Sequence, residues 1–128
     1  MAYLSEFQSK LYDLLKENMS VSIFDETPKN SKMPYVVIED ITVIPLTDKN
    51  SSGFEAIVRI DVWSDYRGNK EANDLITSIM TILMSNTLEL PISQYKQVHI
   101  DISGGGEIVK ETDGLTRSGS LAVRYIFY

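Results

Sequence analysis

The stretch GFEAIVRIDVWSDYRG, residues 53–68, alternates in the way that is typical of a β-strand with one face on a hydrophobic core. Its even positions are all apolar: Phe54, Ala56, Val58, Ile60 and Val62. Its odd positions are mixed: Glu55, Ile57, Arg59, Asp61 and Trp63, the only tryptophan of the chain. The even face is therefore predicted to lie on the core. The isoleucine and the tryptophan on the opposite face need a separate explanation.

Two amphipathic helices are predicted on either side of this strand. Residues 3–18 carry apolar side chains at three- and four-residue spacing, and so do residues 69–85. The first stripe is Tyr3, Leu4, Phe7, Leu11, Leu14 and Leu15, and the second is Ala72, Leu75, Ile76, Ile79, Met80 and Leu83. Each helix is expected to bury this stripe and to leave its other face in water.

Further strands are predicted at the start of 21–34, at 35–44, at 95–103 and at 120–128, from β-branched content or alternation. The order is helix, three strands, helix, two strands. The predicted fold is a single α+β domain, residues 1–128. Its two helices pack on one face of a mostly antiparallel sheet of about five strands. The polar stretch 45–53 is expected to project as a mobile loop, and 104–119 to be a glycine-rich connection.

The composition is that of an ordinary globular protein, with 43% apolar residues, no cysteine and a net charge of −6 over 128 residues. An acidic chain is unsuited to gripping nucleic acid through its phosphates, because such binding depends on lysine and arginine. No apolar run approaches the roughly 18 residues of a membrane span, and the N-terminus does not have the pattern of a signal peptide.

No catalytic, cofactor or metal site is predicted from the motifs. His99 and Asp101 share a strand face, but two ligands do not make a zinc site. Residues 48–59 imitate a calcium loop, yet its twelfth position is Arg59 where a bidentate glutamate is needed. The glycines at 104–106 lack the residues that follow in a phosphate loop.

What remains is surplus apolar surface. Ile57 and Trp63 on one strand, and Ile126 and Tyr128 on the last, lie on nominally wet faces, and Ile82 and Met84 widen the second helix stripe. One interpretation is cover by loops or by a third layer. The other is contact with another subunit, because interface centres favour aromatic residues and arginine, and Arg59 lies between Ile57 and Trp63.

Three segments resemble the small tail-completion, or tail-terminator, proteins of long-tailed bacteriophages. They are IFDETPKNSKMPYVVIED (23–40), DKNSSGFEAIVRIDVWSDYRGNKEAN (48–73) and DGLTRSGSLAVRYIFY (113–128). The shared features are a phrase ending in Asp-x-x-Pro, a Pro-Tyr-Val-Val-Ile strand, and a run with Val-Trp-Ser before a helix. Asp113-Gly114 and Thr116 ahead of the last strand also fit.

The resemblance implies a non-enzymatic virion protein that needs no cofactor. Such proteins form a ring of identical copies, typically hexameric, at the head-proximal end of the tail tube. They stop tube growth and dock to the head connector, while DNA passes through the lumen without specific binding. The implied location is the virion tail, and the host cytoplasm during assembly, with no membrane contact.

Contact residues follow from the apolar surplus and the loop compositions. The candidate subunit interface is Ile57, Arg59, Trp63, Ile82, Met84 and Ile126. The candidate docking residues toward the tube protein or the connector are Thr47, Asp48, Lys49, Asn50, Gly53, Gly105, Glu107, Lys110 and Thr116. The two sets suit a head-to-tail ring, which needs two different patches on every copy.

Two other function classes stay open on sequence grounds. A ligand- or peptide-binding α+β domain would bury Ile57 and Trp63 in a pocket. An enzyme is the more remote alternative, and its best residue would be His99.

Overall fold

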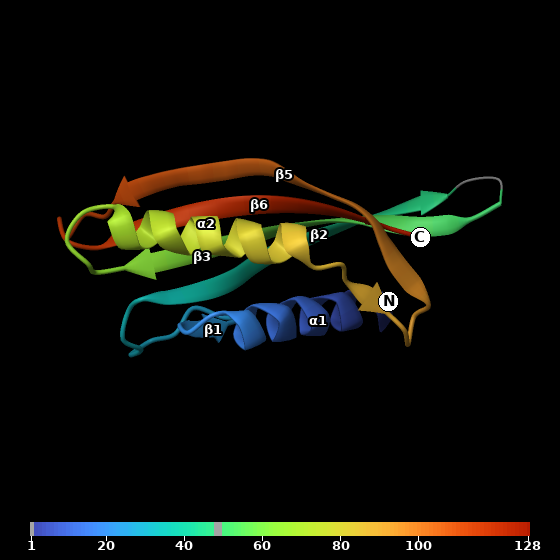
Figure 1. Cartoon of the computed structure of the whole chain (residues 1–128), viewed down its shortest axis with the longest axis horizontal. Helices are drawn as coiled ribbons and strands as arrows, with labels where there is room; N and C mark the ends of the chain where they lie inside the picture. The colour runs from blue at the N-terminus through green and yellow to red at the C-terminus, as the bar shows by residue number, and fades with distance from the viewer. Residues whose placement is uncertain (1, 48–49) are drawn as a thin grey trace.

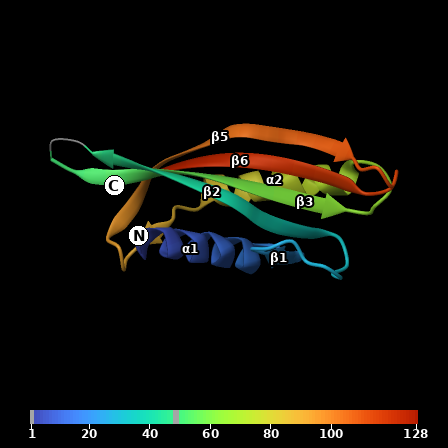
Figure 2. The same cartoon turned by 180° about the vertical axis from the view of Figure 1, so that it is seen from behind.

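The computed structural model describes residues 2–47 and 50–128 and forms one sheet covered by two helices. The elements along the chain are α1 (Ala2–Asn18), β1 (Ser22–Phe24), β2 (Tyr35–Thr47), β3 (Ser52–Ser64), α2 (Lys70–Ser85), β4 (Glu89–Leu90), β5 (Tyr95–Lys110) and β6 (Arg117–Phe127). The strand order is β1-β2-β3-β6-β5-β4. Both helices lie on the same face of the sheet (Figure 1), and the opposite face is bare when the molecule is seen from behind (Figure 2).

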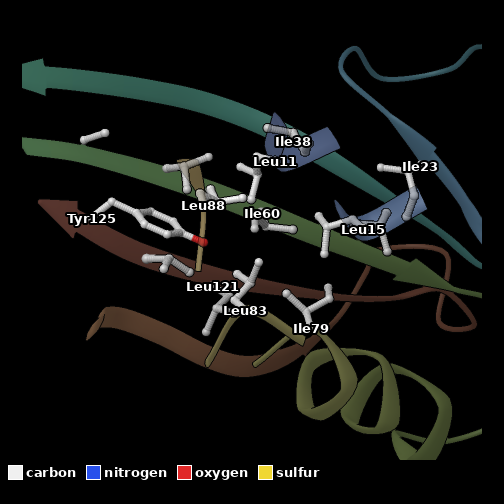
Figure 3. Close-up of a cluster of buried hydrophobic side chains, with 14 of the residues drawn as sticks. Leu11, Leu15, Ile23, Ile38, Ile60, Ile79, Leu83, Leu88, Leu121 and Tyr125 are labelled. Atoms are coloured by element: carbon white, nitrogen blue, oxygen red, sulfur yellow. The ribbon is translucent and has the colours of Figure 1, made fainter. Parts of the chain in front are cut away.

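The alternation of β3 has the predicted consequence. Its five even residues from Phe54 to Val62 are completely buried, and they join a core cluster with both helix stripes. Figure 3 shows Ile60 of β3 between Leu11 and Leu15 of α1 and Ile79 and Leu83 of α2. Because β3 is central and paired on both sides, it is the strand on which the core is assembled.

Aromatic rings close the core at the end near the chain termini. Phe54 and Phe127 are cross-strand partners and stack with ring centroids 4.9 Å apart. Phe7 of α1 meets Tyr125 and Phe127 edge-on. Such aromatic pairs add to the stabilisation that burial alone gives, and they fix α1 on the sheet.

The sheet corrects the prediction in two details. It has six strands rather than about five, because the two-residue β4 pairs with the start of β5. Also, β1 runs parallel to β2, whereas consecutive strands were expected to be antiparallel. The connection 25–34 is long enough to bring the chain back to the same end of the sheet, so β2 can start beside β1.

Two predicted connections are largely strand. Thr47 pairs with Ser52 and Leu46 with Gly53, so β2 and β3 form a long hairpin and only residues 48–51 lie between the strands. The predicted connection 104–119 continues β5 to Lys110, with Ile108 opposite Gly119. Cross-strand pairing with β6 overrides the low strand propensity of the glycines, and irregularities in the register absorb them.

One buried carboxylate orders a turn on the helix side. Glu6 of α1 is only 8% exposed and accepts hydrogen bonds from the backbone amides of Ile92 and Ser93, both at 2.9 Å. Burial opposes the ionisation of Glu6, but these hydrogen bonds outweigh it and hold its pKa below the usual range. Among the described residues, no helix is long and apolar enough to cross a membrane.

Candidate functional site

The candidate site is the sheet face that the helices leave bare, which we call the outer face. Cross-strand register places the odd residues of β3 here, in rows with residues of β2, β6 and β5. One row near the β2–β3 hairpin contains Ile44, Glu55, Ile126 and His99. The next contains Thr42, Ile57, Arg124 and Asp101. The row at the opposite end contains Tyr35, Trp63, Ser118 and Val109.

Arg124 is the centre of one ionic cluster on this face. Its guanidinium donates to Asp101, with 2.7 Å between Nη2 and Oδ2, and lies 3.5 Å from Glu55. His99 Nε2 is 2.7 Å from the same Asp101 oxygen. The Arg124 guanidinium and, after it, the hydrogen bond with His99 hold the pKa of Asp101 below its ordinary value. His99 and Asp101, which the sequence places on one strand face without predicting a metal site, are part of an ion-pair cluster.

Arg59 is the centre of a second cluster. Its guanidinium nitrogens lie 3.4 to 3.8 Å from carboxylate oxygens of Glu39, Asp40 and Asp61. Asp61 also accepts a 2.6 Å hydrogen bond from the Ser120 hydroxyl. No group of three or more metal-ligating side chains suited to a metal ion exists among the described residues. The face is thus organised by ion pairs between neighbouring strands.

The predicted sheet contacts share this face. Ile57, Trp63 and Ile126 are partly buried, and Arg59 is exposed. The register of β3 and β6 places all four on the outer face. The end near Trp63 has some cover of its own, because Tyr35 and Val37 are buried there and Phe24 meets Tyr35 edge-on. The indole Nε1 of Trp63 is buried without a hydrogen-bond partner among the described residues. Contacts within the chain therefore account for the apolar side chains at the Trp63 end of the face. They do not account for Ile57 and Ile126 at the other end.

The predicted helix contacts lie on the far side of the sheet. Met84 of α2 is 47% exposed, whereas Ile82 is partly buried and packs against the core. The six predicted interface residues are thus divided between two surfaces, with the sheet between them (Figures 1 and 2).

The predicted docking residues fall into two groups at opposite ends of the molecule (Figure 1). Thr47, Asn50 and Gly53 belong to the end of the β2–β3 hairpin, while Asp48 and Lys49 lie outside the described residues. Gly53 is buried, and a Cβ atom there would come 2.0 Å from the Phe127 carbonyl oxygen. Gly53 therefore lets the C-terminal segment pack closely on β3.

The second docking group lies on β5 and on the β5–β6 turn. Gly105, Glu107 and Lys110 are exposed on β5, but Thr116 is buried. Asp113 accepts hydrogen bonds from the hydroxyl and the amide of Thr116 and from the amide of Leu115, and these hold its pKa below the ordinary value. This Asx-type turn displays Leu115, which is 71% exposed. The predicted docking residue Thr116 is therefore an internal contact of the turn, and the exposed side chain beside it is Leu115, which the sequence analysis did not single out.

A family model described as tail completion protein gp17 matches residues 9–128 of the chain. The chain belongs to this family. It is therefore a phage tail-completion protein with a structural role in the tail, as the resemblance of its sequence motifs predicted.

Solved structures share the fold, among them the following two. A chain of the structure titled "Virion of native gene transfer agent (GTA) particle" aligns with a TM-score of 0.70 and 17% identity, over 94% of this chain and 92% of that one. The bacteriophage SPP1 gp17 protein aligns with a TM-score of 0.50 and 26% identity, over 97% of this chain and 84% of that one. Among curated protein sequences, none matches the chain.

Proposed function

We propose that copies of this tail-completion protein form a ring, typically hexameric, at the head-proximal end of the phage tail tube. The ring ends polymerisation of the tube protein and docks to the head connector. The observation that carries the proposal is the outer face, a bare surface of four long strands that holds partly buried apolar side chains among ordered ion pairs. Such a mixture is typical of surfaces that pack against another protein.

Two surfaces of the chain are suited to head-to-tail contact between copies. One contact is assigned to Ile57, Arg59, Trp63 and Ile126 on the outer face. The other is assigned to Met84 and to the exposed part of the Ile82 side chain on α2. A closed ring needs two different patches on each copy, and these lie on opposite sides of the sheet.

The two ends of the long axis are suited to different partners. The β2–β3 hairpin projects at one end, and the β5–β6 turn with its rigid Asx-type bonds lies at the other (Figure 1). We propose that one end contacts the tube and the other the connector. The net charge of −6 supports a lumen through which DNA passes without specific binding, because acidic surfaces repel phosphates.

Electron microscopy of tail tubes polymerised with and without the chain tests this function. Tubes capped at one end and limited in length are expected, and uncapped tubes of unchanged length would refute the proposal. Ile57→Asp is expected to abolish capping, because it introduces a charge on the outer face. Ile92→Asp, the same change at an 83% exposed isoleucine on the helix-side turn, should cap normally. If both variants capped the tubes equally well, the outer face would not form the subunit contact.

A further inference from the structure

A groove opens on the helix side of the molecule, at the end where the chain turns from β3 into α2. It has a volume of about 350 Å³. It is lined by the first half of α2, by Tyr66 of the β3–α2 turn, by Val21 after α1 and by Pro34 before β2. Tyr66 is 55% exposed, Val21 and Pro34 are partly buried, and the α2 wall includes the apolar Leu75. The groove thus combines an open aromatic ring with aliphatic surface.

The charged side chains that line the groove are paired within the chain. Lys70 Nζ lies 2.8 Å from Asp74 Oδ2, and Glu71 accepts a 2.6 Å hydrogen bond from the Ser64 hydroxyl. Ser64 is completely buried, and its oxygen also accepts the backbone amide of Tyr66 at 3.1 Å. These bonds fix the turn that carries Tyr66. Because the charges already have partners, the groove is suited to an apolar side chain from another molecule.

The same end of the molecule presents such a side chain. Leu115 of the β5–β6 turn is largely exposed, and its backbone amide is held by Asp113. Arg117 Nε donates to Asn69 Oδ1 at 2.9 Å, which ties the β5–β6 turn to the β3–α2 turn. Both turns therefore lie at one end of the long axis, where α2 begins (Figure 1). Leu115 is displayed on an ordered turn beside the groove and is not buried in it.

We propose that Leu115 of one copy inserts into this groove of the next copy in the ring. The inference rests on the proposed function, in which the long axis of every copy runs from the tube to the connector. Leu115 and the groove then lie at the same level in all copies. They are two different surfaces, as a head-to-tail contact requires. Glu107 and Lys110, which are exposed on β5, stay free to dock to the tube or the connector.

The position of the groove on α2 favours a second copy over the other tail components. Leu75, Ser78 and Ile82 follow one another at three- and four-residue spacing, so they lie along one stripe of the helix. Ile82 is already assigned to the contact between copies, and the groove extends that surface toward the start of α2. This helix runs along the long axis (Figure 1). The tube and the connector would meet the ends of that axis, whereas a neighbouring copy meets its side.

Cross-linking of double-cysteine variants on capped tail tubes tests the contact. The chain has no cysteine, so Leu115→Cys with Ser78→Cys places one thiol on the turn and one at the groove. A short bismaleimide cross-linker should then give a ladder of linked copies, up to the complete ring, on a denaturing gel. Each single variant should give no ladder. Leu115→Cys with Ile92→Cys is the matched control, because Ile92 is exposed on the β4–β5 turn at the opposite end (Figure 1), and it should give none either.

Matched substitutions of Leu115 measure what the contact contributes to capping. Leu115→Asp should raise the concentration needed for capping at least about tenfold, the loss expected when one leucine side chain is not buried. Leu115→Met, which keeps an apolar side chain of similar volume, should cap as the wild type does. Capping by Leu115→Asp at the wild-type concentration would overturn the proposal.

The combined results separate this contact from the proposed function. If the wild type capped tubes but the Leu115–Ser78 pair gave no ladder, or gave links only within single copies, the contact would be overturned and the ring would stand. Lost capping by Leu115→Asp without a ladder from the cysteine pair would place Leu115 on the tube instead. Tubes left uncapped by the wild type would refute both the ring and the contact.

Discussion

The two faces of β3 have opposite characters. On the face toward the helices, every residue from Phe54 to Val62 at an even position is completely buried in apolar surroundings. On the outer face, the alternate residues contact partners through ion pairs and leave isoleucine and tryptophan partly open. The same backbone thus carries a core on one side and, on the other, a surface of ion pairs and partly exposed apolar side chains.

The difference shows where the stability of the fold lies. Close-packed apolar side chains stabilise the folded state in proportion to the area they remove from water, and salt hardly affects this contribution. Exposed ion pairs contribute little and are screened by salt. Substitutions on the outer face should therefore cost less stability than substitutions on the helix side.

The largest effect is expected from matched truncations on the two faces. Ile60→Ala should lower the free energy of unfolding by about 3 kcal/mol, because Ile60 is completely buried between α1 and α2. Ile57→Ala, three residues earlier on the outer face, should lower it by about 1 kcal/mol or less. Urea unfolding of the isolated chain measures both. Equal losses would show that the outer face is as tightly packed as the core.

The next effect concerns the only buried carboxylate on α1 that the structure describes. Glu6→Gln should lower the melting temperature by several degrees at neutral pH. A glutamine offers one acceptor and a competing NH₂ donor to the two amides of Ile92 and Ser93. Because the pKa of Glu6 is lower in the folded state, its stabilisation is present above the ordinary value of 4.5 and disappears as the pH falls through the folded value. The gap between the wild type and the variant should therefore narrow on acidification. A gap independent of pH would contradict the role assigned to the Glu6 carboxylate.

The sequence predicts the helix side of the fold better than the outer face. Regular periodicity identified both helices and the buried residues of β3, because burial on one face imposes that pattern directly. The glycines at 104–106 gave no strand signal, since their pairing with β6 is a tertiary effect. The parallel β1 and the Glu6 turn also depend on residues distant in the chain.

The candidate site could be predicted only in part, because periodicity can be read from the sequence and contacts between distant residues cannot. Alternation placed Ile57 and Trp63 on one surface, and the register with β6 adds Ile126. It could not predict that Pro34, Tyr66 and Leu75 line one groove, because that depends on how three distant segments pack together. Nor could it predict which carboxylates the two arginines pair with, since those ion pairs join different strands.

A smaller effect, of opposite sign, is expected inside the core. The Tyr125 hydroxyl is buried without a hydrogen-bond partner among the described residues, so Tyr125→Phe should raise the free energy of unfolding by about 1 kcal/mol. Tyr128→Phe, at a 39% exposed tyrosine three residues later, should leave it unchanged. Burial also raises the pKa of Tyr125 above its ordinary value of 10.0, so the wild type should lose stability as the pH rises past that value. Tyr125→Phe should not show this part of the loss of stability at high pH. If Tyr125→Phe were less stable than the wild type, the Tyr125 hydroxyl would have a hydrogen-bond partner in the folded protein.

The smallest effect is expected on the outer face, at the ion pairs that organise it. Arg124→Gln should raise the pKa of Asp101 toward 3.8, its ordinary value, because Arg124 makes the strongest of the hydrogen bonds that lower it. In the wild type, the stabilisation from Asp101 is present above that value and is lost as the pH falls through the lower, folded pKa. With its folded pKa closer to the ordinary value, the variant should lose less stability on acidification, and the loss should be complete at a higher pH. A ¹³C titration of the Asp101 carboxyl group measures the shift of its pKa, and added salt should reduce this shift.

Arg59→Gln serves as the control, because Arg59 pairs with Glu39, Asp40 and Asp61 and not with Asp101. If Arg59→Gln moved the Asp101 pKa as far as Arg124→Gln does, the two clusters would be one electrostatic unit, and the outer face would act as a whole when a partner binds.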